Sequence, residues 1–340
     1  MYPLIPIDKL NVIQWLVCCK LQPMLFHSNK SKHYLLLALK VGILAVTFGY
    51  IFIKLTQNTP LAFHDFAASL YVDRSNALFF LLFLTLAAAN WAFEILKWQT
   101  ATSIVAPITF KTALKQSLSA LTISLATPNR IGDYGAKIMY FPVDKRKQIL
   151  LLNFLSNTIQ MAITAIFGFM GLLYIVPKFS LTYSATHLIL FLICIFLLGL
   201  LAYLFKERQL LINGLSIKNV LMYLARIKNS IKIKIGGYAL LRYVIFNFLF
   251  YLLLLFFGAE IGFLEAIPLI FSMYLLVSII PTIFLFDLVV RGGVAVWLFS
   301  LVGVNELIVL STITAMWILN FVLPAIWGSF YVATFKLEAR

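Results

Sequence analysis

Long apolar runs alternate with short charged segments along this chain. A helix needs about 20 consecutive apolar residues to cross the hydrocarbon core of a bilayer. Six runs are of about this length or longer: about 34–55, 75–93, 148–177, 179–205, about 239–259 and 307–335. They are continuously apolar, whereas the strands of a membrane barrel alternate apolar and polar residues. The pattern therefore predicts an all-α, polytopic membrane bundle with about six full spans.

Two regions break this pattern. Their uncharged pieces are too short for ordinary spans: 98–110 and 116–129 in one region, and 292–305, behind Arg291, in the other. Each region also contains a proline, which removes a backbone donor and breaks a helix. These features predict re-entrant hairpins or broken helices over 112–141 and 264–300. For 127–147, a solvated cytoplasmic loop is the alternative.

Lysine and arginine are unevenly distributed, which predicts the orientation of the chain. The segments 97–147 and 206–237 are rich in them, whereas 56–76 and 177–185 hold one each. Basic residues gather in cytoplasmic loops. The two basic segments and both termini are therefore expected on the cytoplasmic side of the cell inner (plasma) membrane. The first hairpin then enters from the cytoplasm and the second from outside.

The domain organisation follows from the same runs. We expect an interfacial amphipathic segment, 1–33, and a single transmembrane domain, 34–340, whose halves 34–205 and 238–335 flank a basic linker, 206–237. The net charge of +15 fits this orientation rule and attraction to anionic lipid headgroups. No nucleic-acid recognition motif accompanies it, so we expect no nucleic-acid partner.

Motifs of soluble enzymes are missing from the sequence. The three cysteines and four histidines show no metal-ligand spacing, and neither GxSxG, HExxH, a P-loop nor a Rossmann fingerprint occurs. We therefore expect no catalytic residue, no metal and no cofactor. The lack of a nucleotide motif also argues against ATP-driven pumping by this chain alone.

The two broken regions share an order of residues. Each has an apolar run, a proline, an aspartate, a base four positions later, small residues and then aromatics: Pro128, Asp133 and Lys137 in "ATPNRIGDYGAKIMYF", and Pro281, Asp287 and Arg291 in the second. Acid and base at i and i+4 lie on one helix face and can pair. Broken helices inserted from opposite faces build the midplane site of inverted-repeat transporters. An inverted repeat is one interpretation, and chance similarity of two loops is the other.

Several residues in these regions are candidates for binding an anionic substrate. Arg130 and Arg291 carry the planar donor fork that suits phosphate, and the alternatives are an orienting charge and an ion pair with Asp287. The remaining candidates for the substrate site are Asp133, Asp287, Lys137, Glu94, Asn129 and Gly132. Glu94 either closes a cavity or pairs with Lys97 at the interface. We expect hinges or close packing at Pro128, Pro281, Gly132, Gly292 and Gly293.

Polar residues on the apolar runs are expected to face the interior of the bundle. They are Asn153, Ser156, Asn157 and Gln160 on one run, with Asn247 and Asn320 on two others. Hydrogen bonds between helices are the usual reason for such residues. A hydrophilic path is the alternative.

The segments "NWAFEILKW", "LATPNRIGDYGAKIMYF" and "IIPTIFLFDLVVRGGVAVWLF" resemble the lysylphosphatidylglycerol synthase transmembrane-region family over about 35–335. Its first motif is similar to Pro128, Gly132 and Asp133. Its second is similar to Pro281, Gly292 and Gly293, although the family's following glutamate has no counterpart here. The resemblance implies the flippase half of an aminoacyl-phospholipid synthase, without the soluble aminoacyl-transferase domain.

The sequence thus leads to the expectation of a transporter or flippase of an anionic phospholipid or lipid-linked precursor. Its partners would be that lipid, the bilayer and a separate lipid-modifying synthase. Two alternatives stay open. One is a membrane enzyme that uses Glu94 and Asp133 as paired carboxylates, and the other is a non-transporting scaffold of a lipid-synthesis complex.

Overall fold

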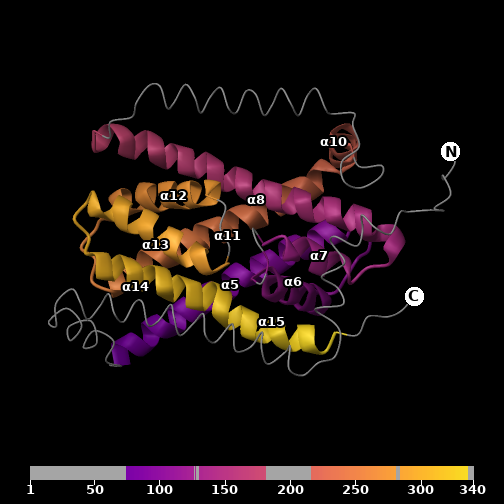
Figure 1. Ribbon diagram of the computed structural model, residues 1–340, viewed down its shortest axis with the longest axis horizontal. Helices are drawn as coiled ribbons and strands as arrows, with labels where there is room; N and C mark the ends of the chain where they lie inside the picture. The colour runs from indigo at the N-terminus through magenta and orange to yellow at the C-terminus, as the bar shows by residue number, and fades with distance from the viewer. Residues whose placement is uncertain (1–73, 126, 128–129, 181–215, 281–283, 336–340) are drawn as a thin grey trace. The chain divides into compact units, whose positions relative to one another are not determined.

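The computed structural model describes residues 74–125, 127, 130–180, 216–280 and 284–335, all within the larger of two compact units (Figure 1). The described residues form helices and no strand. The N-terminal segment 1–33, the predicted span 34–55, nearly all of 179–205, and Pro128, Asn129 and Pro281 lie outside the described residues. The all-helical class predicted from the apolar runs is confirmed for the described part of the chain.

Four stretches of helix are long and apolar enough to cross a membrane within the described ranges. They are α5 (Arg74–Thr102), α8 (Val143–Lys178), α11 (Asn229–Phe256), and the continuous α14 (Glu306–Trp317), η2 (Ile318–Val322) and α15 (Leu323–Ala333). They match four of the six predicted runs. The chain is therefore built as a helical membrane protein, because so many apolar helices of this length are typical of the bilayer.

Two helix boundaries differ from the prediction by more than five residues. The second predicted span stops before Glu94, but α5 continues to Thr102 because Glu94 finds basic partners inside the bundle. The predicted basic linker is also helical where it is described. It contains α10 (Ile217–Arg226) and the first turns of α11, which begins at Asn229 rather than near residue 239.

Both predicted breaks are present. The first region forms α6 (Phe110–Leu125) and α7 (Gly132–Ile138), and we call this pair the first hairpin. The second hairpin consists of α12 (Phe263–Ile279) and α13 (Phe284–Ser300). Arg291, which separates the two uncharged pieces of this region in the sequence, does not interrupt a helix. Arg291 lies within α13, because its pairing with Asp287 one turn earlier lets the helix continue through the charge.

Each hairpin returns to the end of the bundle from which it starts. The start of α6 and the residues after α7 join one buried cluster with the end of α5 and the starts of α8 and α11. We call this the basic end. The second hairpin starts at the opposite end, where Glu265 pairs with Lys178 at the end of α8. The two hairpins therefore enter the bundle from opposite ends, with α12 and α13 toward the left and α6 and α7 toward the right in Figure 1.

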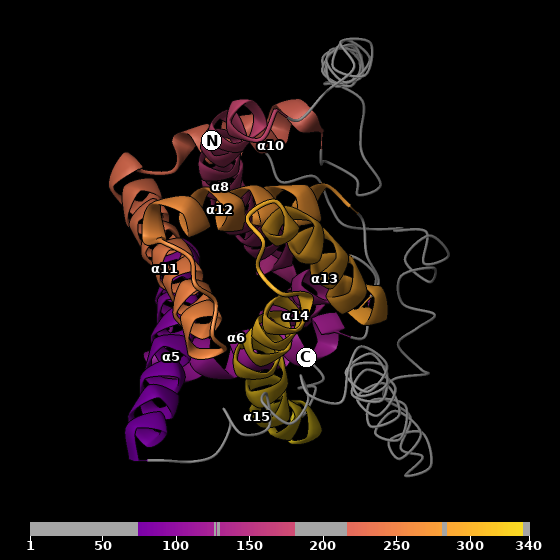
Figure 2. The ribbon, with the colours of Figure 1, turned by 90° about the vertical axis from the view of Figure 1, so that its left-hand side faces the viewer.

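Three helix pairs make the most extensive contacts: α5 with α11, α8 with α12, and α6 with α15 (Figures 1 and 2). Glycines allow two of these approaches. A Cβ on Gly171 of α8 would lie 2.5 Å from the carbonyl oxygen of Pro268 in α12. A Cβ on Gly328 of α15 would overlap the carbonyl oxygen of Leu118 in α6. The first helix of each hairpin thus packs closely against a spanning helix, α6 against α15 and α12 against α8.

Candidate functional site

The tips of the two hairpins meet at a shared carboxylate. Arg130, at the turn between α6 and α7, places Nη2 3.5 Å from Oδ2 of Asp287 near the start of α13. Arg291 donates from Nε to the same oxygen at 2.9 Å. Arg130 has a φ of 56°, a left-handed conformation that is uncommon for residues with a side chain. Such backbone conformations concentrate at functional sites, where the surrounding structure maintains them.

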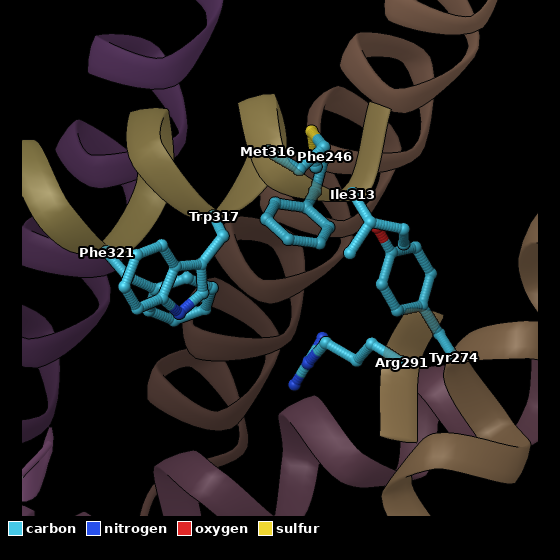
Figure 3. Close-up of a pocket in the computed structure, with 7 residues that line it drawn as sticks. All are labelled: Phe246, Tyr274, Arg291, Ile313, Met316, Trp317 and Phe321. Atoms are coloured by element: carbon cyan, nitrogen blue, oxygen red, sulfur yellow. The ribbon is translucent and has the colours of Figure 1, made fainter. Parts of the chain in front are cut away.

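Phe321 lies beside both arginines. Its ring centroid is 4.5 Å from the guanidinium carbon of Arg130 and 5.9 Å from that of Arg291. Figure 3 shows Arg291 reaching toward the rings of Phe321 and Trp317. Phe321 belongs to the π-helix η2, and single π-turns are frequent at functional sites. Its neighbour Asn320 accepts a hydrogen bond from Nδ2 of Asn90 at 2.9 Å, which ties η2 to α5.

A second group of charges lies between the first hairpin and α8. Lys137 of α7 pairs with Asp133 at 3.0 Å and donates to Oδ1 of Asn153 at 3.0 Å. Asn153 in turn donates to Asp133 at 2.7 Å, and Asn157 donates to it at 3.5 Å. Lys137 is only 2% exposed and lies over the ring of Trp98. The predicted pairing of Asp133 with Lys137 and the inward position of the α8 polar residues are confirmed.

A third group joins α5 to α11. Glu94 accepts from Lys97 at 2.7 Å and from Arg242 at 2.7 Å. Lys97 is 1% exposed and also lies 3.5 Å from Oε1 of Gln160 on α8. A buried carboxylate between two cations is an internal ion-pair network. The pairing of Glu94 with Lys97 is confirmed, but both side chains are buried among helices rather than exposed at an interface.

We call these three groups together the central charged cluster: Arg130, Arg291, Lys137, Lys97 and Arg242 with Asp287, Asp133 and Glu94. They are close enough to interact across group boundaries, since Arg130 is within electrostatic range of Asp133 and Arg242, and Glu94 of Lys137. Five cationic side chains face three carboxylates, an excess of two positive charges. In an apolar bundle such an excess favours an anion.

The other predicted site residues have mixed outcomes. Gly132 packs closely, because a Cβ there would lie 2.8 Å from the carbonyl oxygen of Ile123. Gly292 lies near Leu310 of α14, whereas an added Cβ on Gly293 would meet nothing, so close packing at Gly293 is wrong. Asn247 and Asn320 are both buried, as predicted. Pro128, Asn129 and Pro281 lie outside the described residues.

Two residues of the site were missed by the sequence analysis. Arg242 is one of the few charges in an apolar run, and that position was a usable signal. Phe321 offered none, because the sequence does not distinguish it from the other 30 phenylalanines. Only the fold shows which aromatic ring lies beside both arginines.

The space beside Arg291 is small. The pocket bounded by Arg291, Phe321, Trp317, Tyr274 and residues of α11 and α14 has a volume of about 10 Å³ (Figure 3). This is room for about one water molecule. A phosphate-bearing headgroup would need the helices around Phe321 to separate. The described residues contain no group of three His, Cys, Asp or Glu side chains placed to hold a metal ion.

The architecture is that of a helical membrane protein with charged groups buried between its helices. No protein-family model, no curated protein and no solved structure matches the chain.

Proposed function

We propose that this protein is a transporter or flippase for an anionic phospholipid or a lipid-linked precursor. The observation that carries the proposal is the meeting of the hairpin tips, where Arg130 and Arg291 share the single carboxylate of Asp287. One carboxylate cannot neutralise two guanidinium groups. A phosphate between them would complete the charge balance, because arginine binds phosphate through paired donors.

The position of the arginines supports a path through the membrane. The arms α6 and α12 have 16 and 17 residues, so each is about 25 Å long, compared with a hydrocarbon core of about 30 Å. Hairpins of this length that enter from opposite ends bring their tips into the membrane interior. A headgroup held there is between the two leaflets.

An inverted repeat accounts for the packing of the two halves. Gly171 of α8 faces Pro268 and Ser272 of α12, and Gly328 of α15 faces Leu118 and Thr122 of α6. In each crossing the hydroxyl donates to the carbonyl oxygen four residues earlier, and the glycine lies against both. A two-fold axis in the membrane plane that exchanges α6 with α12 and α8 with α15 relates the crossings.

The resemblance to the lysylphosphatidylglycerol synthase transmembrane-region family suggests which class of lipid the protein moves. An aminoacylated or anionic phospholipid is the first substrate to test, and a separate synthase is the partner that would supply it. The basic end of the bundle is the cytoplasmic end of a plasma-membrane protein, following the positive-inside rule. Both termini lie on that side in this proposal.

A scaffold that transports nothing is the second candidate. The volume of about 10 Å³ beside Arg291 favours it, because this structure has no room for a headgroup there. Transport requires α13 and η2 to move apart, whereas a scaffold does not. No observation favours an enzyme, since Glu94 and Asp133 are each bound by their own cations.

Lipid translocation in proteoliposomes separates the two candidates. The purified chain is reconstituted with fluorescent anionic, aminoacylated and zwitterionic lipids, and label in the outer leaflet is destroyed by a membrane-impermeant reductant. We expect protein-dependent loss of inner-leaflet label for anionic or aminoacylated lipid, and its reduction in Arg291→Ala. Lys178→Gln removes the same charge from an exposed pair at the far end, and it should leave the rate unchanged. No movement of any lipid would support the scaffold.

A further inference from the structure

A second recessed surface lies at the basic end, away from the hairpin tips. It is a groove of about 360 Å³ between the end of α5, the connection to α6 and the first turns of α11. Its lining residues are Leu96, Gln99, Thr100, Ser103, Pro107, Ile108, Ile231, Lys234 and Tyr238. This volume falls within the usual range for small-molecule sites, about 300–1,000 Å³. None of the central charged cluster lines it.

The charge of the groove has one sign. Among the described residues that line the groove, Lys234 is exposed and is the single ionisable side chain apart from Tyr238, and none is a carboxylate. Lys228 and Lys232 lie within two turns of it, and the first turn of α11 holds no acidic residue. Lys232 donates to the carbonyl oxygen of Ala225 and is held against the end of α10. The groove is therefore complementary to an anion.

The position of the groove along the spanning helices indicates that the anion belongs to a lipid. The groove lies where two spanning helices end, which is the level of lipid headgroups. The neighbouring α10 has no buried residue, and it exposes the apolar Leu221 and Met222 together with the basic Lys218 and Arg226. A helix with this distribution lies in the membrane interface. Apolar and basic surfaces thus continue from α10 to the groove.

We propose that this groove binds the headgroup of an anionic phospholipid from the leaflet at the basic end. Lys234 pairs with the phosphate, and the hydroxyl of Thr100 is within the same lining to donate to its oxygens. The hydroxyl of Ser103 donates to the carbonyl oxygen of Thr100 at 2.7 Å instead. Leu96, Ile108 and Ile231 provide apolar contact for the glycerol and the first acyl carbons. Basic pockets between spanning helices on the cytoplasmic side hold lipid headgroups in this way. The site does not depend on the proposed transport.

Native mass spectrometry of the full chain in detergent tests this site. Phosphatidylglycerol and phosphatidylcholine are titrated onto wild type, Lys234→Gln and the charge-matched control Lys178→Gln. We expect phosphatidylglycerol to bind more tightly than phosphatidylcholine in wild type and control, and about ten-fold more weakly in Lys234→Gln, a loss that corresponds to one charge-assisted contact. Equal binding of phosphatidylglycerol by wild type and Lys234→Gln would overturn the proposal.

Two further variants separate this groove from the arginines. Ser103→Trp adds a bulky ring at an exposed position in the lining and should block binding without disturbing the buried core. Arg130→Ala serves as the marker of the proposed site at the hairpin tips, because Arg130 is not among the lining residues of the groove. Loss of binding in Arg130→Ala with retention in Ser103→Trp would place the lipid at the hairpin tips and refute the groove. Displacement of the lipid by an equal concentration of inorganic phosphate would also contradict it.

Discussion

Arg130 and Asp287 lie 157 positions apart in the chain, yet their side chains meet at 3.5 Å. This contact joins the tips of two hairpins that enter the bundle from opposite ends. Asp287 also accepts from Arg291 at 2.9 Å, so one carboxylate restrains both cations. The contact is therefore both a tie between the hairpins and a place where an anion can substitute for a carboxylate.

Replacement of the shared carboxylate should destabilise the protein. Asp287→Asn leaves Arg130 and Arg291 without their common partner in a poorly solvated position. Removal of one member of a buried pair typically lowers the free energy of unfolding by about 3–5 kcal/mol. We expect a loss at the lower end of this range, because the Arg130 side chain is 43% exposed. Thermal unfolding in detergent measures the loss. Asp144→Asn, at an exposed carboxylate on α8, is the control, and equal melting temperatures for the two variants would contradict the role of Asp287.

Breaking the buried network around Glu94 should destabilise the protein much more than breaking an exposed ion pair. Glu94→Gln leaves the 1%-exposed Lys97 and Arg242 without a counter-charge, so the free energy of unfolding should fall by about 3 kcal/mol or more. Glu265→Gln breaks the exposed pair with Lys178, and such pairs contribute about 0–1 kcal/mol. Melting curves of the two variants in one detergent test the difference. The assignment fails if Glu265→Gln costs as much as Glu94→Gln.

The two glycine crossings predict a position-dependent effect of alanine. Gly171→Ala and Gly328→Ala force a methyl group against a neighbouring helix backbone, and such overpacking costs about 1–3 kcal/mol. Gly236→Ala adds the same methyl group to α11 where nothing lies within 4 Å, and helix propensity predicts a gain of about 0.5–1 kcal/mol. Thermal stability in detergent should therefore fall for the first two and rise for the third. A rise for all three would mean that the crossings are loose.

Much of the architecture was readable from the sequence because it depends on local rules. Apolar runs of spanning length gave the end of α8 and both ends of the helix Glu306–Ala333 to within two residues, whereas α8 begins at Val143, five residues before the predicted run. Short pieces with a proline gave both helix breaks. The i, i+4 rule gave the pairs of Asp133 with Lys137 and of Asp287 with Arg291.

The long-range contacts were not readable, because no local rule selects a partner on another helix. Glu94 looked like an interfacial residue at the end of a span, since its second partner, Arg242, is 148 positions away. The same holds for Arg130, whose local acid is Asp133 but whose ion pair is with Asp287. Buried charge networks of this kind depend on the folded arrangement of helices.

Phe321 should control the space beside the arginines. Phe321→Leu removes the ring and enlarges a pocket that now has room for about one water molecule. A soluble headgroup analogue, glycerol phosphate, should then raise the melting temperature of the variant more than that of wild type, because it reaches Arg130 and Arg291. Phe330→Leu, at an exposed ring of α15, should respond as wild type does. An equal or smaller shift in Phe321→Leu would show that the ring does not limit access.

The most direct measurement is the translocation rate of an anionic lipid in proteoliposomes for wild type, Arg130→Ala, Arg291→Ala and the double variant. Both arginines act on one headgroup in this account, so each single substitution should reduce the rate by about ten- to a hundred-fold, and the double variant should lose little more. Circular dichroism and elution profiles establish that the variants are folded. Translocation at the wild-type rate in both single variants would contradict the account.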